Sequence, residues 1–100
     1  MAGFIQIMEF DTARIEEVEA LAARMEKERG DALLARKATV TADRDRPNHY
    51  FVIVEFDSYE EAMKNSNDPA TQKYSEEMGA LLGGPPTFHN LDVRGSMLES

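Results

Sequence analysis

The sequence of 100 residues contains no cysteine and no tryptophan, and its eleven Lys and Arg are outnumbered by nineteen Asp and Glu. Without cysteine the chain can form no disulfide, thiolate nucleophile, iron–sulfur cluster or thiolate zinc site. A disulfide-stapled secreted fold is therefore excluded, and a cytoplasmic location is expected. The formal charge of −8 disfavours nucleic acid and anionic lipid as partners, because binding to either depends on clustered basic side chains.

Long apolar runs are also lacking. No stretch approaches the ~20 residues that a bilayer requires, and the start, MAGFIQIMEF, lacks the basic region of a signal peptide. We therefore expect a soluble chain without a membrane partner. Because a chain of this length normally forms one core, we expect a single domain over residues 1–100, with its ordered part at about 3–94.

The first half of the sequence predicts a strand, a helix and a second strand. Residues 4–10 (FIQIMEF) are rich in strand formers. Apolar residues at helical spacing, with acids first and bases last, predict a helix over about 13–29 with Thr12 as its N-cap and Gly30 as its stop. Residues 33–42 (LLARKATVTA) predict a more exposed edge strand, and residues 43–48 a turn.

The second half predicts a strand, an interrupted helix and a last strand. Residues 50–56 (YFVIVEF) form the strongest strand pattern in the chain. Ser58 and Glu61 have the spacing of a capping box, which begins a helix, and Asp68-Pro69 breaks and restarts that helix. Residues 87–94 (TFHNLDVR) alternate as a strand, and residues 95–100 are expected to form a frayed tail.

The element order β-α-β-β-α-β predicts a ferredoxin-like α+β fold, with a four-stranded antiparallel sheet and both helices on one face. The first and third strands should be central, yet both are apolar on two sides. The large apolar residues on the side without helices are Ile5, Ile7, Phe51 and Ile53. Such a patch marks an interaction site, and a second copy is its simplest cover; we predict a sheet-to-sheet homodimer. Glu9 and Glu55 share this side and are interpreted as its hydrated rim rather than as a carboxylate pair.

Two segments carry a resemblance to a known family: HYFVIVEFDSYEEAMKNSNDPATQKY and the closing PTFHNLDV. They resemble the dimeric α/β-barrel superfamily, in which two ferredoxin-like protomers close their sheets into one barrel, over about residues 3–94. That superfamily includes cofactor-independent antibiotic-biosynthesis-type monooxygenases, haem-degrading enzymes and stress-responsive barrel proteins. The haem-degrading branch relies on a Trp with a haem-ligating His, and many monooxygenase members carry an active-site Trp, which this chain lacks.

His49 and His89 are the two histidines of the chain. Histidine is the side chain most readily poised as a base near neutral pH. His89 is the catalytic candidate because it alternates in phase with Leu91 and Val93, which suggests that one side of it is enclosed. His49 opens the central strand and is a ligand-binding candidate. The alternative interpretation is that both are partly exposed strand-end residues without a chemical role.

Gln6 is a polar residue on an otherwise apolar side of the first strand, where an unpaired amide would cost roughly 1–3 kcal/mol. One interpretation is a cleft between sheet and helices in which Gln6 and Tyr50 offer hydrogen bonds to an organic ligand. The other is that Gln6 pairs with the hydroxyl of Tyr50 or Tyr74 in the core. Tyr74, on the second helix, is also a ligand-binding candidate, with core packing as its alternative.

Motifs for cofactors are absent: there is no His cluster with metal spacing, no G-x-G-x-x-G, no P-loop and no G-x-S-x-G, so no metal or nucleotide cofactor is indicated. An RNA-recognition motif has the same element order, but it requires a basic residue and Gly followed by alternating aromatics. Here His49 and Tyr50 replace the first pair and Ile53 stands where a stacking ring belongs. With a charge of −8, RNA binding is disfavoured.

Two functions follow. The first is a small dimeric barrel that binds a small apolar or aromatic organic ligand in a stress-response or metabolic role. The alternative is a cofactor-independent monooxygenase that acts on an aromatic or polyketide-like substrate. In that case His89 would deprotonate the substrate, or Gln6 and Tyr50 would hold it. An open cleft between sheet and helices that contains His89 would favour the enzyme, and a filled core would favour the binding protein.

Overall fold

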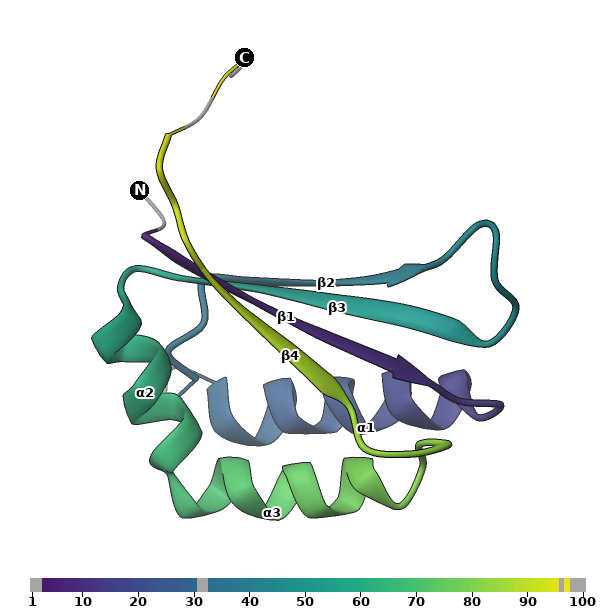
Figure 1. The fold of residues 1–100 in the computed structure, drawn as a ribbon. Coiled ribbons are helices and arrows are strands. Elements are labelled where there is room, and N and C mark those ends of the chain that lie inside the picture. The colour runs from purple at the N-terminus through teal and green to yellow at the C-terminus, as the bar shows by residue number, and fades with distance from the viewer. Residues whose placement is uncertain (1–2, 31–32, 96, 98–100) are drawn as a thin grey trace.

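The computed structural model describes residues 3–30, 33–95 and 97, and it is an α+β fold with one sheet (Figure 1). Its elements are β1 (Phe4–Asp11), α1 (Ile15–Arg29), β2 (Lys37–Ala42), β3 (His49–Phe56), α2 (Tyr59–Asn67), α3 (Pro69–Gly79) and β4 (Thr87–Asp92). The antiparallel strands lie in the order β2-β3-β1-β4, and the helices lie on one side of the sheet (Figure 1). The predicted ferredoxin-like fold with the first and third strands at its centre is confirmed.

Strand register decides which side chains share a face of the sheet. Gln6 of β1 is opposite Val54 of β3 and Asn90 of β4, and these residues face the helices. Ile7 is opposite Ile53 and His89, and these residues face away from the helices. We call this second side, which no described helix covers, the open face.

The core forms where the helices meet the ends of the central strands. At one end, Phe4 and Phe56, each 2 % exposed, pack with Ala62 of α2. At the other end Phe10 is also 2 % exposed, and α1 buries Val18. Between these ends, the residues of β1 that face the helices are only half-buried, so the middle of the sheet is less completely covered.

The predicted N-cap of the first helix is wrong. Arg14 is the N-cap, no side chain caps the helix, and α1 begins at Ile15 rather than at residue 13. The Thr12 hydroxyl instead accepts a hydrogen bond from the Arg14 amide at 3.0 Å and donates one to the Leu81 carbonyl at 2.6 Å. Thr12 therefore ties the end of β1 to the loop after α3. The predicted stop is confirmed, since Gly30 ends the helix with a φ of +48° that other residues rarely adopt.

The second strand is shorter than its pattern predicts, since β2 spans Lys37–Ala42 rather than residues 33–42. The apolar residues before it are half-buried, and Ala35 packs against the Phe4–Phe56–Ala62 core. Their apolar character reflects burial in the crossing segment rather than strand pairing. The edge position of β2 is confirmed. The last strand also ends early, at Asp92, and residues 96 and 98–100 of the predicted tail lie outside the described residues.

The interruption of the second helical segment is confirmed. The Ser58 hydroxyl accepts a hydrogen bond from the Glu61 amide and begins α2, and the Asp68 carboxylate accepts one from the Ala70 amide and begins α3. Asp68 also forms an ion pair at 3.0 Å with Arg29 at the end of α1. Of the described helices, none is long and apolar enough to cross a membrane.

Candidate functional site

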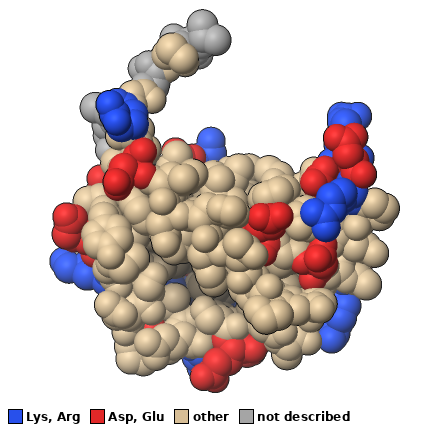
Figure 2. Space-filling model, viewed as in Figure 1, with Lys and Arg blue, Asp and Glu red and all other residues tan. Residues whose placement is uncertain are grey.

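The first candidate site is a cleft between the sheet and the helices. Its floor is the middle of the central strands, where Gln6, Met8, Val52 and Val54 are half-buried although they face the helices. On the edge strand β4, Phe88 lies opposite Met8 and is 52 % exposed. Figure 2 shows a hollow between β4 and the helix layer. The helices pack on both ends of the central strands and leave an apolar, accessible middle.

Two polar groups reach this cleft from the sheet. The Gln6 amide donates a hydrogen bond to the Asn90 side chain at 3.0 Å, so the second of the two interpretations, in which Gln6 pairs with a tyrosine hydroxyl, is wrong. Tyr50 stacks on Phe10 with ring centroids 6.0 Å apart. Neither the Gln6 side-chain carbonyl nor the Tyr50 hydroxyl forms a hydrogen bond with another described residue, so both can bind a ligand.

A further polar group, which was not among the candidates predicted from the sequence, is the side chain of Asn65 on α2. It lies three residues after the buried Ala62, on the side of α2 that faces the sheet. Its side-chain oxygen is buried and has no hydrogen-bond partner among the described residues. Buried carbonyls are normally paired, so this oxygen is an acceptor with unused hydrogen-bonding capacity. The signal was present in the sequence as an amide on the apolar stripe of the helix.

Tyr74 is not part of the cleft floor. Its hydroxyl donates to the Glu28 carboxylate of α1, and the Arg24 guanidinium lies 5.5 Å from its ring centroid. These contacts join α3 to α1. The structure therefore does not bring Tyr74 to Gln6 or Tyr50, and it gives the residue a structural contact between helices.

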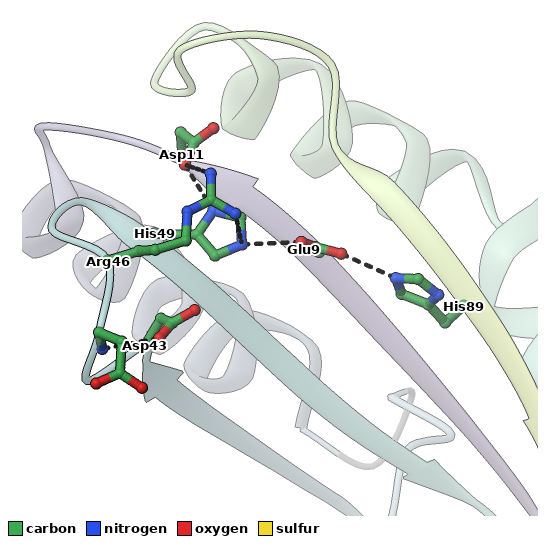
Figure 3. Close-up of polar contacts among 7 residues, drawn as sticks. Glu9, Asp11, Asp43, Arg46, His49 and His89 are labelled. Atoms are coloured by element: carbon green, nitrogen blue, oxygen red, sulfur yellow. Dashed lines mark hydrogen bonds and ion pairs between the residues drawn. The ribbon is translucent and has the colours of Figure 1, made fainter.

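The second candidate site is a polar cluster on the open face (Figure 3). His49 of β3 is 5 % exposed. Its Nδ1 lies 2.6 Å from an Asp11 carboxylate oxygen and its Nε2 lies 2.8 Å from a Glu9 carboxylate oxygen. The other oxygen of Glu9 lies 3.0 Å from Nε2 of His89 on β4. Glu9 thus bridges the two histidines, a contact that its interpretation as a hydrated rim residue did not include.

Protonation in this cluster follows from its hydrogen bonds. The hydrogen bond to Asp11, supported by that to Glu9, raises the pKa of His49 above its ordinary value, while burial and the nearby Arg46 charge oppose the shift. Hydrogen bonds from His89 and then from His49 lower the pKa of Glu9. The cluster therefore favours an imidazolium at His49 between two carboxylates.

Two surface depressions accompany these sites. A cavity of about 260 Å³ lies beside the polar cluster and is lined by Asp11, Arg46, His49 and the turn at 83–85. A larger, shallow groove of about 620 Å³ lies along Tyr59 and Met63 of α2, and none of the predicted site residues lines it. Within the described part of the chain, no group of His, Asp and Glu has the arrangement of a metal site.

The two candidate sites lie on opposite faces of the sheet. Gln6 and Tyr50 face the helices, whereas His89 and His49 lie on the open face. A cleft that contains His89 between sheet and helices, which would have favoured the enzyme, is therefore not present. The predicted interface residues share the open face with the histidines: Ile5, Ile7, Phe51 and Ile53 are half-buried, and Leu91 beside them is 45 % exposed.

Comparison with known proteins reveals similarity in fold rather than in sequence. No family model matches the chain, and no curated protein matches it significantly. SnoaB, a cofactor-independent oxygenase from Streptomyces nogalater, matches with a TM-score of 0.81 over 99% of this chain and 100% of its own, at 16% identity. A conserved protein from Methanosarcina mazei Go1 matches with a TM-score of 0.77 over 91% and 92% of the two chains, at 9% identity.

A third structure, that of an antibiotic biosynthesis monooxygenase, matches with a TM-score of 0.71 over 92% of this chain and 99% of its own, at 14% identity. Identities this low establish shared architecture and not shared chemistry. The sequence-based resemblance is confirmed at that level: this chain has the ferredoxin-like fold of the antibiotic-biosynthesis-monooxygenase structures.

Proposed function

We propose that this protein binds a small, uncharged aromatic or apolar organic molecule in the cleft between its sheet and its helices. The observation that carries the proposal is the buried, unpartnered carbonyl oxygen of Asn65. An unsatisfied buried acceptor costs about 1–3 kcal/mol. A ligand that donates an N–H or O–H to this oxygen would remove that cost, so the cleft favours a donor-bearing ligand.

The remaining groups of the cleft define the class of ligand. Met8, Val52 and Val54 offer apolar surface, and methionine adapts well to varied apolar shapes. The Gln6 carbonyl and the Tyr50 hydroxyl add an acceptor and a donor without adding charge. An aromatic body that carries one or two hydroxyl or amine groups fits this set, since few and well-placed polar groups in apolar surroundings are typical of small-molecule sites.

We also propose that the protein works as a sheet-to-sheet homodimer. The open face is apolar at its centre, and Leu91 extends the patch onto β4. Four strands of about seven residues give a flat face of roughly 450 Å². Pairing two such faces would bury on the order of 1,000 Å², which is about the minimum area of a biological interface. The ligand cleft lies on the opposite side and would stay accessible.

Binding of N-phenyl-1-naphthylamine, a neutral aromatic probe with one N–H donor, tests the ligand proposal. We expect its fluorescence to rise in the presence of the protein, and Asn65→Leu to weaken binding about tenfold, as expected for one lost hydrogen bond. Tyr74→Phe is the matched control, because Tyr74 lies outside the cleft floor. Equal affinities for the wild type and Asn65→Leu would contradict the proposal, as would an equal loss in the control.

The alternative is a cofactor-independent oxygenase, and the observation in its favour is the match to SnoaB over nearly the whole chain. Its substrate would be a phenolic aromatic held by the same cleft. Gln6, Tyr50 and Asn65 include no carboxylate or imidazole to act as a base, and His89 lies on the other face. For this reason we favour binding over catalysis. Oxygen uptake in the presence of a polyhydroxylated anthracene tests this alternative. If the wild type and Tyr74→Phe consume oxygen and Asn65→Leu does not, catalysis is favoured over binding alone.

A further inference from the structure

The open face combines an apolar centre with a polar end. Along the central strands the apolar pair Ile7 and Ile53 is followed by Glu9 opposite Phe51 and then by Asp11 opposite His49. The His49 ring also packs edge-on against Phe51, with centroids 5.2 Å apart. The cluster is therefore continuous with the surface through which two copies are proposed to pair, and covering that surface would also enclose part of the cluster.

Hydrogen-bond chemistry makes the His49 proton necessary to the cluster. Both ring nitrogens lie within 2.8 Å of carboxylate oxygens, and an ionised carboxylate can only accept hydrogen bonds. A doubly protonated ring donates to both Asp11 and Glu9. A neutral ring donates to one of them and turns a lone pair toward the other, which is repulsive at this distance.

The members of the cluster differ in their contact with water. His49 is already enclosed at 5 % side-chain exposure, whereas the side chains of Glu9, His89 and Asp11 are 26 %, 44 % and 60 % exposed. Water thus still stabilises the carboxylates in a single chain. A second copy laid over the apolar centre would remove part of this water, and the carboxylates would then depend more strongly on the positive charge of His49.

The other ionisable groups near His49 also favour its protonated form in the dimer. The charged side chains that contact its ring are Glu9 and Asp11 from β1 and Arg46 from the β2–β3 turn. His89 from β4 is joined to it through Glu9, and Asp43 of the turn bonds to His49 through the backbone alone. On β2 the neighbouring residue of this face is Thr41, which is uncharged and bonds to the Phe51 carbonyl. The ring thus faces two carboxylates and one guanidinium, so a proton on His49 reduces the excess negative charge that pairing must enclose.

We propose that the pairing of two copies through the open face is coupled to protonation of His49, so that the dimer is tighter when His49 is charged and looser when it is neutral. This inference rests on the proposed sheet-to-sheet homodimer. Arg46 does not replace the proton, because its side chain is 60 % exposed and lies 3.4 Å from the ring nitrogen that must donate to Glu9.

Sedimentation velocity of the full chain at pH 5.5 and pH 8.5, at equal ionic strength, tests the coupling. We expect the dimer dissociation constant to be at least about tenfold larger at pH 8.5, which corresponds to a pairing-induced rise of about half a pKa unit at each of two copies. His49→Gln should abolish the difference between the two pH values. His89→Gln is the matched control on the same cluster and should retain it.

Each result has a distinct meaning. Equal dissociation constants at both pH values, or a tighter dimer at pH 8.5, would overturn the coupling and leave the dimer intact. A chain that stays monomeric at both pH values up to hundreds of micromolar would overturn the dimer and the coupling together. If His49→Gln fails to fold, an NMR titration of the wild-type His49 ring decides the question, since its pKa must be higher in concentrated than in dilute protein.

Discussion

Asn65 gives the sharpest test of the cleft, because the same substitution should move stability and binding in opposite directions. Asn65→Leu keeps the branched shape of the side chain and replaces the buried, unpartnered oxygen with a methyl group. Removing the desolvation cost of that oxygen is worth about 1–3 kcal/mol. The better helix propensity of leucine adds a few tenths of a kcal/mol. We therefore expect the ligand-free variant to be more stable than the wild type by at least about 1 kcal/mol.

Urea unfolding, followed by circular dichroism, measures this effect on protein refolded from denaturant so that no co-purified molecule remains. For a domain of this size, each kcal/mol also corresponds to a melting temperature increase of roughly 4–8 °C. Asn67→Leu is the control on the same helix, since Asn67 is exposed and the substitution there changes helix propensity without affecting a buried acceptor. Its stability should change by no more than about 0.5 kcal/mol.

The refuting result is equally specific. If Asn65→Leu is less stable than the wild type, or gains no more than Asn67→Leu, the Asn65 oxygen is not a cost to the folded state and has no need of a ligand. If Asn65→Leu is more stable and also binds the naphthylamine probe about tenfold more weakly, Asn65 carries a polar group retained for binding at the expense of stability, as functional sites often do.

Three further outcomes are expected. The pKa of His49 is raised, so this residue contributes stability at pH values below its ordinary pKa of 6.5, and the contribution is lost as pH rises. The pKa of Glu9 is lowered, so this residue contributes stability at pH values above its ordinary pKa of 4.5, and the contribution is lost as pH falls. Melting temperatures measured from pH 4 to pH 9 should therefore contain a component that is greatest between these values. In His49→Gln the loss toward high pH should be absent, whereas the loss toward low pH should persist in part because His89 also bonds to Glu9. Gly3→Ala should lose about 1–3 kcal/mol in urea unfolding, because a Cβ there would lie 2.6 Å from the Asp57 carbonyl oxygen; an unchanged midpoint would contradict this contact. Ser58→Ala should cost about 0.5–2 kcal/mol by the same measurement, through loss of the cap of α2, and Ser58→Thr should retain most of the stability.

The elements of this fold were largely predictable because their signals are local. Alternation over residues 4–10 and 50–56 marks strands, and hydrogen bonds between near neighbours begin α2 at Ser58 and α3 at Asp68. The element order β-α-β-β-α-β also indicated that the first and third strands are central. The N-cap at Thr12 was wrong because its hydroxyl bonds to Leu81, 69 residues later in the chain, and no local pattern reports such a contact.

The sequence by itself determined the element order, the central strands and the polarity of each face, because strand and helix periodicity assign side chains to faces wherever the chain folds. Only the tertiary structure decided which groups meet. It separated His89 from Gln6 by placing them on opposite faces, it brought His49, Glu9 and His89 together across three strands, and it buried the Asn65 oxygen without a partner. The physical reason is that hydrogen bonding and desolvation depend on distances between residues remote in sequence, which strand register and helix packing set.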